Sequence, residues 1–239
     1  MSRLYLVRHA QASFLEQTYD KLSALGETQS KLLGEFWVHH NLAFDRACSG
    51  PCIRQKDTAR IVSEAYRAVG TAFPPLTAMP EFDEYQGEAV LECSLPGLVE
   101  SDSEIRRLNV AFQVSSDASA RRRTFQKLFE AVIARWVDEQ IPSNSVEPWR
   151  DFAARVNSGF MKFLSSGAPN ECVAIFTSGG PIGLAVQRAL DLTPQNALRV
   201  SWMAQNASFS EFLYSADRFT MSSFNTAPHL DDPSLQTYR

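Results

Sequence analysis

The sequence lacks the features that would place it in a membrane or on nucleic acid. None of its apolar runs is long enough to span a bilayer. Its 23 Lys and Arg residues do not outnumber its 27 Asp and Glu residues, and the net charge is −4 at pH 7. Binding to phosphate backbones depends on clustered Lys and Arg, and the basic run Arg121-Arg122-Arg123 fits the solvated face of a helix. We therefore expect neither a nucleic-acid partner nor a membrane partner.

Signatures of metal binding, nucleotide binding and export are missing as well. The four cysteines have no paired zinc spacing, so we expect reduced thiols and no metal site at Cys48, Cys52, Cys93 or Cys172. No Gly-x-Gly-x-x-Gly or Gly-Lys-Ser/Thr run follows an apolar segment, which argues against a nucleotide cofactor. Only Met1-Ser2-Arg3 precede the first apolar segment, too few for an export signal. The expected location is the cytoplasm.

The clearest chemical signal lies in the first dozen residues. The apolar run Leu4-Tyr5-Leu6-Val7 predicts a buried strand, and Arg8 and His9 follow at its carboxyl end. Ligands bind at that end of the strands in open α/β sheets. An imidazole there is a candidate nucleophile, and a guanidinium beside it fits the oxygens of a phosphoryl group. A His after a strand, taken alone, is more often a structural residue.

Two further strand-to-helix junctions have the same design. A strand over 42–48 ends at Ser49-Gly50-Pro51, and a helix then runs to Val69. This places Arg54 in the first helical turn, where backbone N–H groups attract anions. A buried strand over 172–176 leads into Thr177-Ser178-Gly179-Gly180-Pro181 and another helix, which is a second anion site of this kind.

The rest of the pattern predicts an α/β protein with a helical insertion. Amphipathic or alternating periodicity favours helices over 23–40, 119–140 and 149–164, and strands over 207–214 and 218–224. Polar connections are expected over 11–20 and 141–145. We interpret the segment 86–148 as a helical cap inserted into a single domain that spans 1–239.

Three segments match the pattern of a known family. Leu6 to Ala10 correspond to an Arg-His-Gly signature, Ser49 to Ala59 to a Ser-x-x-x-x-Arg-x-x-x-Thr-Ala segment, and Phe176 to Ile182 to a strand-Gly-Gly-helix junction. On these residues the sequence resembles the histidine phosphatase superfamily, also called the phosphoglycerate mutase-like family. The resemblance covers residues 1–85 and 148–225, and the insertion is where that family varies most.

The resemblance implies a three-layer α/β/α fold with a mixed, mostly parallel sheet and a phosphohistidine mechanism without metal or cofactor. His9 would take the phosphoryl group, and Arg8 and Arg54 would bind its oxygens. Glu81 would protonate the leaving oxygen, with Glu84 as the competing acid. Covalent capture divides one difficult displacement into two easier ones, and Arg stabilises the charge on the phosphoryl oxygens, so the chemistry of these residue types agrees.

The sequence departs from the family pattern at two positions. Ala10 stands where the signature has Gly, which the same turn accepts if φ is negative. Ser178 stands where the family has its second catalytic His, just before Gly179. A hydroxyl still donates to a phosphoryl oxygen but carries no charge, and losing one preorganised donor costs roughly 10²- to 10³-fold in rate. His39 and His40 fit a helix end, so only His229 in the C-terminal tail remains as a substitute.

The leading hypothesis is a phosphomonoester hydrolase that acts on a small-molecule phosphoester through His9, with Arg8, Arg54, Ser178 and Gly179 binding phosphate. A catalytically silent phosphate-binding or regulatory module is the first alternative, because Ser178 replaces a charged donor. A mutase-type phosphotransferase is the second, although Gln11 to Leu15 lack the Asn expected of mutases. Exposed strand edges near the C-terminus would allow two copies of the chain to pair, so a homodimer is a further alternative.

Overall fold

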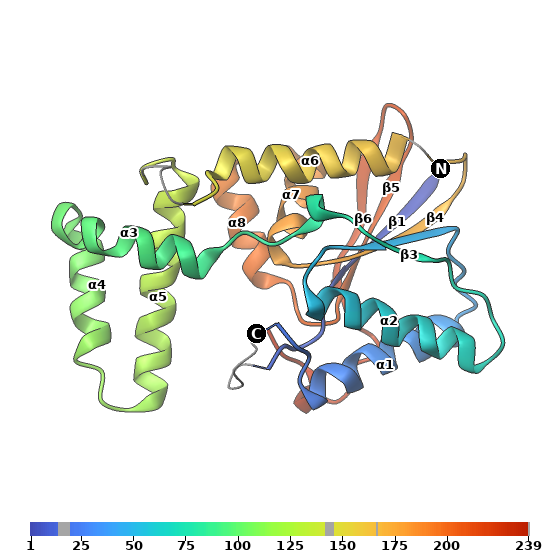
Figure 1. Cartoon of the computed structure of the whole chain (residues 1–239), viewed down its shortest axis with the longest axis horizontal. Coiled ribbons are helices and arrows are strands. Elements are labelled where there is room, and N and C mark those ends of the chain that lie inside the picture. Colours follow the sequence, from blue (N-terminus) through green and yellow to red (C-terminus); the bar gives the residue numbers. More distant parts are fainter. Residues whose placement is uncertain (14–19, 142–145, 166, 239) are drawn as a thin grey trace. The chain divides into compact units, whose positions relative to one another are not determined.

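The centre of the molecule is one six-stranded sheet in the order β3-β2-β4-β1-β5-β6 (Figure 1). The structure is a computed structural model that describes residues 1–13, 20–141, 146–165 and 167–238. Four strands run parallel: β1 (Ser2–Arg8), β2 (Arg46–Ser49), β3 (Leu76–Ala78) and β4 (Cys172–Thr177). Two strands pair antiparallel at one edge: β5 (Phe209–Tyr214) and β6 (Phe219–Thr226). The predicted mixed, mostly parallel sheet is confirmed.

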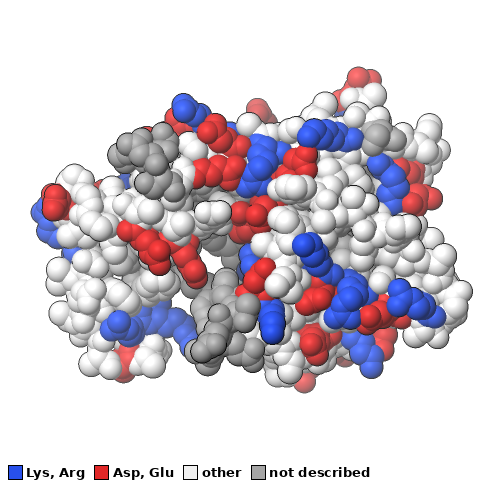
Figure 2. All heavy atoms as spheres, in the orientation of Figure 1, with Lys and Arg blue, Asp and Glu red and all other residues white. Residues whose placement is uncertain are grey.

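Helices cover both faces of this sheet and complete the three predicted layers (Figure 1). One face carries α1 (Ala24–His39) and α2 (Ile53–Ala68). The other carries α7 (Gly179–Leu190), α8 (Pro194–Met203) and the Arg155–Ser165 part of α6 (Trp149–Ser165). The short helices η1 (Pro80–Phe82) and η2 (Pro233–Leu235) lie in connections. Charged side chains of both signs are interspersed over the displayed face (Figure 2), as the nearly balanced composition leads one to expect.

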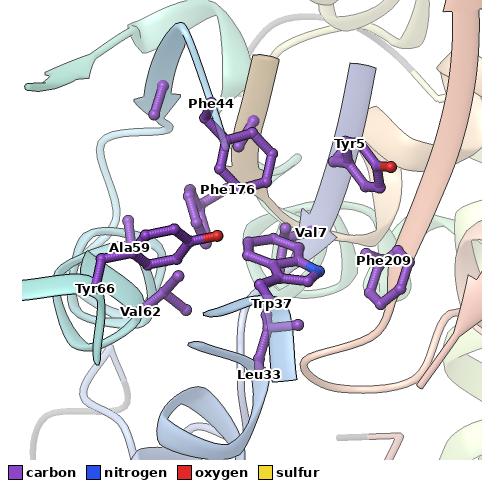
Figure 3. Close-up of a cluster of buried hydrophobic side chains, with 12 residues drawn as sticks. Tyr5, Val7, Leu33, Trp37, Phe44, Ala59, Val62, Tyr66, Phe176 and Phe209 are labelled. Atoms are coloured by element: carbon purple, nitrogen blue, oxygen red, sulfur yellow. The ribbon is translucent and has the colours of Figure 1, made fainter. Parts of the chain in front are cut away.

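An aromatic cluster fills the layer between the sheet and α1 and α2 (Figure 3). Trp37 of α1 is its central ring, and its centroid lies 4.9 to 6.3 Å from those of Tyr5, Phe44, Phe176 and Phe209. Aromatic pairs at such distances stabilise a core beyond the area they bury. Because side chains alternate along a strand, Tyr5 and Val7 both enter this cluster, which fixes β1 just before His9.

Residues Tyr85–Ala154 form a second compact unit. It contains α3 (Gly87–Ser101), α4 (Ser103–Gln113) and α5 (Ala118–Val137). Asp102 connects these helices, because one of its oxygens caps α4 and the other accepts a hydrogen bond from Arg135 of α5 at 2.9 Å. Within the unit the buried Trp136 packs against Trp149 and donates to the backbone carbonyl of Glu147 at 2.9 Å. The segment that we interpreted as a cap falls within this unit.

Several predicted element boundaries are wrong. The second strand begins at Arg46 rather than at Leu42, and α3 runs from Gly87 to Ser101 with Pro96 inside it. Helix α8 was not predicted from the sequence. Its start nevertheless follows a common pattern, because Thr193 caps its N-terminus and Pro194 occupies its first turn. Most of the predicted loop at 11–20 and of the connection at 141–145 lies outside the described residues. No described helix is long and apolar enough to cross a membrane.

A buried ion pair holds the amino ends of the parallel strands together, at the edge of the sheet opposite to His9. Arg46, which begins β2, donates two hydrogen bonds at 2.9 and 2.8 Å to Glu171, which precedes β4. The Tyr214 hydroxyl of β5 donates to the same carboxylate at 2.5 Å. The Glu171 side chain is only 3% exposed. The hydrogen bonds from Arg46 and Tyr214 therefore replace the hydrogen bonds to water that this carboxylate loses on burial.

We expect Arg46→Met to lower the free energy of unfolding by about 3 kcal/mol, because it leaves a carboxylate buried with one partner only. Denaturant titration followed by circular dichroism measures this loss. Arg60→Met is the matched control, since the Arg60 pairs with Asp57 and Glu64 are exposed and pairs of that kind contribute about 0.5 kcal/mol. Equal unfolding midpoints for the two variants would contradict the assignment.

Candidate active site

The predicted site residues come together because three parallel strands end side by side. In the register of the sheet, Arg8 pairs with Thr177, and Ser49 pairs with Phe176. His9 and Ser178 each follow directly, and the backbone N–H of His9 donates to the carbonyl of Thr177 at 2.8 Å. Neighbouring strands lie about 4.8 Å apart. The two residues therefore emerge next to each other at the carboxyl edge of the sheet.

The His9 imidazole is held as a neutral base whose Nε2 carries the lone pair. It is 8% exposed, and its Nδ1 lies 2.8 Å from the carbonyl oxygen of Ala10. A carbonyl only accepts, so Nδ1 carries the proton and Nε2 is the acceptor. Burial, followed by the positive charges of Arg54 and Arg8, lowers the pKa of His9 well below its usual range. A neutral imidazole is the form that can act as a nucleophile at neutral pH.

Arg54 connects this imidazole to an acidic loop residue. Its Nε donates to His9 Nε2 at 3.1 Å, and its Nη1 donates to Asp20 at 2.8 Å. The Asp20 carboxylate also accepts from the backbone N–H of Ile53 at 2.8 Å. An anion therefore already sits at the N-terminus of α2, as the sequence predicts for that position, but it belongs to the chain itself.

Backbone contacts fix the turn that follows β1. The N–H of Ala10 donates to Thr58 Oγ1 at 3.0 Å, and Thr58 donates to the carbonyl of Arg54 at 2.7 Å, so the first strand and α2 are locked together. On the other side, the buried Asn206 donates to the carbonyl of His9 at 3.1 Å. Ala10 has a negative φ, so the turn accepts it in place of Gly.

Arg8 approaches from the opposite side of the turn. Its Nη1 donates to the carbonyl oxygen of Ala204, which ends α8. Its charge contributes to the lowered pKa of His9. Arg54 of α2 thus contacts the His9 imidazole directly, whereas Arg8 is bound to the end of α8 and affects His9 through its charge.

The junction after β4 is filled by side chains from two other elements. Ser178 is fully buried, and its Oγ accepts a hydrogen bond from Gln55 Nε2 at 2.8 Å. The N–H of Gly180 donates to both oxygens of Glu84, each at 3.1 Å. At Gly179 a Cβ would lie 2.7 Å from the carbonyl oxygen of Ser201, so only glycine lets α8 approach this closely. Glu84 therefore lies where the sequence predicts an anion.

Glu81 is engaged elsewhere. Its carboxylate accepts from Lys162 of α6 at 2.6 Å, and its backbone carbonyl accepts from Arg155 at 3.1 Å. The hydrogen bond from Lys162 lowers the pKa of Glu81. Glu81 thus contacts α6, whereas the Glu84 carboxyl group contacts Gly180 at the start of α7. The geometry favours Glu84 over Glu81 as the acidic group near Ser178.

Comparison with known proteins identifies the family. The sequence model of the histidine phosphatase superfamily (branch 1) matches residues 4–92 and 105–227. The chain belongs to this superfamily. A comparison with curated protein sequences gave no significant match.

Solved structures of phosphatases and of a mutase share the fold at low sequence identity. The α-ribazole phosphatase from Shigella flexneri is 17% identical, with a TM-score of 0.61 over 94% of this chain and 96% of the other. A mycobacterial glucosyl-3-phosphoglycerate phosphatase is 20% identical, with a TM-score of 0.61 over 95% and 100%. The phosphoglycerate mutase from Bacillus anthracis str. Sterne is 16% identical, with a TM-score of 0.63 over 95% and 94%. At these identities the similarity shows the fold alone.

Three residues of the candidate site were not predicted from the sequence. Gln55 directly follows Arg54 on α2, and its adjacency to a predicted site residue was the only available signal. Asn206 lies in an irregular segment before β5, where Ala207 takes a positive φ of 56°. Asp20 fell within a predicted loop, and nothing in its neighbourhood indicates that it would reach Arg54.

The tail does not carry His229 into the site as a substitute for the second His. Its ring is 7% exposed and packs against two aromatic rings of the core, with centroids 6.1 Å from Phe36 and 6.5 Å from Phe209. Burial lowers the pKa of His229 to about 4. His229 is therefore a neutral core residue under ordinary conditions.

This burial predicts how stability depends on pH. The unfolded chain protonates His229 near pH 6.5 and the folded chain only near pH 4, so between these values the unfolded state binds more protons and stability falls as the pH falls. His229→Phe removes this contribution. From pH 7 to 5 we expect the variant to lose about 2 kcal/mol less than the native chain, since the slope approaches about 1.4 kcal/mol per pH unit below pH 6.5.

Denaturant unfolding at pH 7, 6 and 5 measures the difference. The exposed His39 provides the control, and His39→Gln should follow the native chain throughout. A His229→Phe curve parallel to the native one would show that His229 is not kept neutral by the fold.

Proposed function

We propose that the chain is a phosphomonoester hydrolase that acts through a phosphohistidine on His9. The observation that carries the proposal is the 3.1 Å contact between Arg54 Nε and His9 Nε2, with Nδ1 engaged by Ala10. It combines a neutral nitrogen lone pair with an adjacent guanidinium, which are the two groups that phosphoryl capture requires. The family and the phosphatase and mutase neighbours are consistent with this chemistry.

In the first step, His9 Nε2 forms a bond to phosphorus while the bond between phosphorus and the leaving oxygen breaks. Arg54 turns from Nε2 to the phosphoryl oxygens, and Arg8 and the amides at the start of α7 bind the remaining charge. The leaving oxygen takes a proton from a carboxylic acid and departs as an alcohol. In the second step water attacks phosphorus, the same carboxylate takes its proton, and the products are free His9 and inorganic phosphate.

We assign the proton transfer to Glu84 rather than to Glu81. A general acid must hold its proton at working pH and must reach the leaving oxygen. Glu81 is bound to Lys162, which lowers its pKa and favours the ionised form. Glu84 lies at the N–H of Gly180, two residues from Ser178, and so has its carboxyl group at the junction where we place the phosphoryl group.

The nucleophile is tested with p-nitrophenyl phosphate. We expect the native chain to release p-nitrophenol and to accumulate a phosphoenzyme that is labile in acid and stable in alkali. His9→Ala should abolish both signals, a loss of at least about 10³-fold. His39→Ala is the matched control, because His39 is exposed at the end of α1. Binding of phosphate without turnover of any phosphoester would instead favour the silent phosphate-binding module.

The assignment of the acid is tested by changing the leaving group. Glu84→Gln keeps an oxygen that accepts from Gly180 but cannot donate a carboxylic proton. An alkoxide needs that proton and p-nitrophenolate does not, so kcat/KM should fall about 10²-fold or more for an alkyl phosphate and far less for p-nitrophenyl phosphate. Glu81→Gln is the matched control and should change neither value greatly. If Glu81→Gln, and not Glu84→Gln, lowers kcat/KM selectively for the alkyl phosphate, then Glu81 is the general acid.

A further inference from the structure

Gln55 is a fully buried amide whose hydrogen-bonding groups all have partners. Its Oε1 accepts from the backbone N–H of Cys52 at 3.1 Å. Its Nε2 donates to Ser178 Oγ at 2.8 Å and to the carbonyl oxygen of Phe82 at 3.3 Å. A buried amide with three partners is held in one orientation, because releasing any partner leaves a polar group unpaired away from water.

The partners also determine which way the amide points. The N–H of Cys52 can only donate and the carbonyl of Phe82 can only accept, so the oxygen of Gln55 must face Cys52 and its nitrogen must face Phe82 and Ser178. The Ser178 hydroxyl therefore accepts the Gln55 hydrogen bond and keeps its own proton.

That proton lies at the edge of the sheet where His9 emerges. Ser178 precedes α7, but its hydroxyl does not cap the helix. Within the described part of the chain, no acceptor is recorded for the Ser178 hydroxyl proton. Gln55 and Arg54 are consecutive residues of α2, and one contacts Ser178 while the other contacts His9. A single helical turn thus holds the ends of two adjacent strands.

We propose that Gln55 is a positioning residue that orients the Ser178 hydroxyl to donate to an oxygen of the bound phosphoryl group. The inference rests on the proposed function and extends it to the position where the family pattern has its second His. Ser178 supplies the hydrogen bond, and Gln55 supplies the orientation that an isolated hydroxyl, free to rotate, would lack.

Three variants test the proposal: Ser178→Ala, Gln55→Met and the double variant. Ser178→Ala removes the donor, and Gln55→Met keeps the length of the side chain but cannot orient the hydroxyl. Each single variant should weaken the binding of orthovanadate and lower kcat/KM for p-nitrophenyl phosphate by about 10- to 100-fold, the usual effect of a hydrogen bond to a charged group. The double variant should be no worse than Ser178→Ala, since Gln55 acts only through Ser178.

A purely structural role for Gln55 gives a different result. In that case Gln55→Met lowers the unfolding midpoint but leaves the vanadate dissociation constant unchanged, or its effect multiplies with that of Ser178→Ala. Either result overturns the proposal. Gln29→Met is the matched control, because Gln29 is also fully buried with partners on both sides of its amide, on α1. It should lower stability without weakening vanadate binding.

Gln55→Glu serves if Gln55→Met does not fold. The introduced carboxylate can still accept a hydrogen bond from the N–H of Cys52, but it cannot donate one to Ser178. It would instead accept a hydrogen bond from the Ser178 hydroxyl, which would turn that hydroxyl away from the phosphoryl group. Its effect on vanadate binding should be large in the native background and should not grow when Ser178→Ala is added; growth would overturn the proposal. Binding of vanadate or inorganic phosphate needs no turnover, so comparing the single and double variants tests Gln55 even if the chain does not hydrolyse p-nitrophenyl phosphate. A lack of hydrolysis would refute the proposed function and not the role of Gln55.

Discussion

The parallel register of β1, β4 and β2 is the constraint on which the site depends. Arg8 pairs with Thr177, and Phe176 pairs with Ser49, so the three strands end within one or two residues of one another. A shift of one residue would turn every side chain of a strand to the other face of the sheet. Tyr5 and Val7 would then leave the aromatic cluster around Trp37. The core that stabilises the fold therefore also fixes the position of His9.

The electrostatics of the site follow from burial. Cationic groups and unpaired amides are costly in a medium of low dielectric unless anions accompany them. Here the chain supplies its own acceptors, which are the Asp20 carboxylate at Arg54 and the Glu84 carboxyl group at Gly180. His9, which has no anionic partner among the described residues, stays neutral because of burial and the charges of both guanidinium groups. In the proposed function, an incoming phosphoryl group would enter a site whose donors are already oriented toward negative charge and would replace the contacts of these carboxyl groups.

The sequence was sufficient to predict the elements that local periodicity and turn chemistry determine. The three strand-to-helix junctions, the mixed sheet and the layers are as expected, because apolar runs, Gly-Pro breaks and helix starts are short-range signals. The competition between Glu81 and Glu84 could not be settled in this way, since it depends on Lys162, about eighty residues away in the sequence, which binds the first of them. Gln55 was missed for the same reason, because its partners Phe82 and Ser178 are distant in the chain.

Ser178 also bears on the choice between hydrolysis and phosphoryl retention. A phosphoryl group carries up to two negative charges, and the guanidinium groups of Arg8 and Arg54 supply two positive ones. A His⁺ at position 178 would add a third charge and bind phosphate more tightly, whereas a hydroxyl adds a hydrogen bond without charge. A mutase needs to retain the phosphorylated enzyme, and a hydrolase needs to release phosphate. A site with two cations and a neutral donor at 178 suits release, so the replacement of His by Ser is consistent with hydrolysis and argues against the mutase alternative.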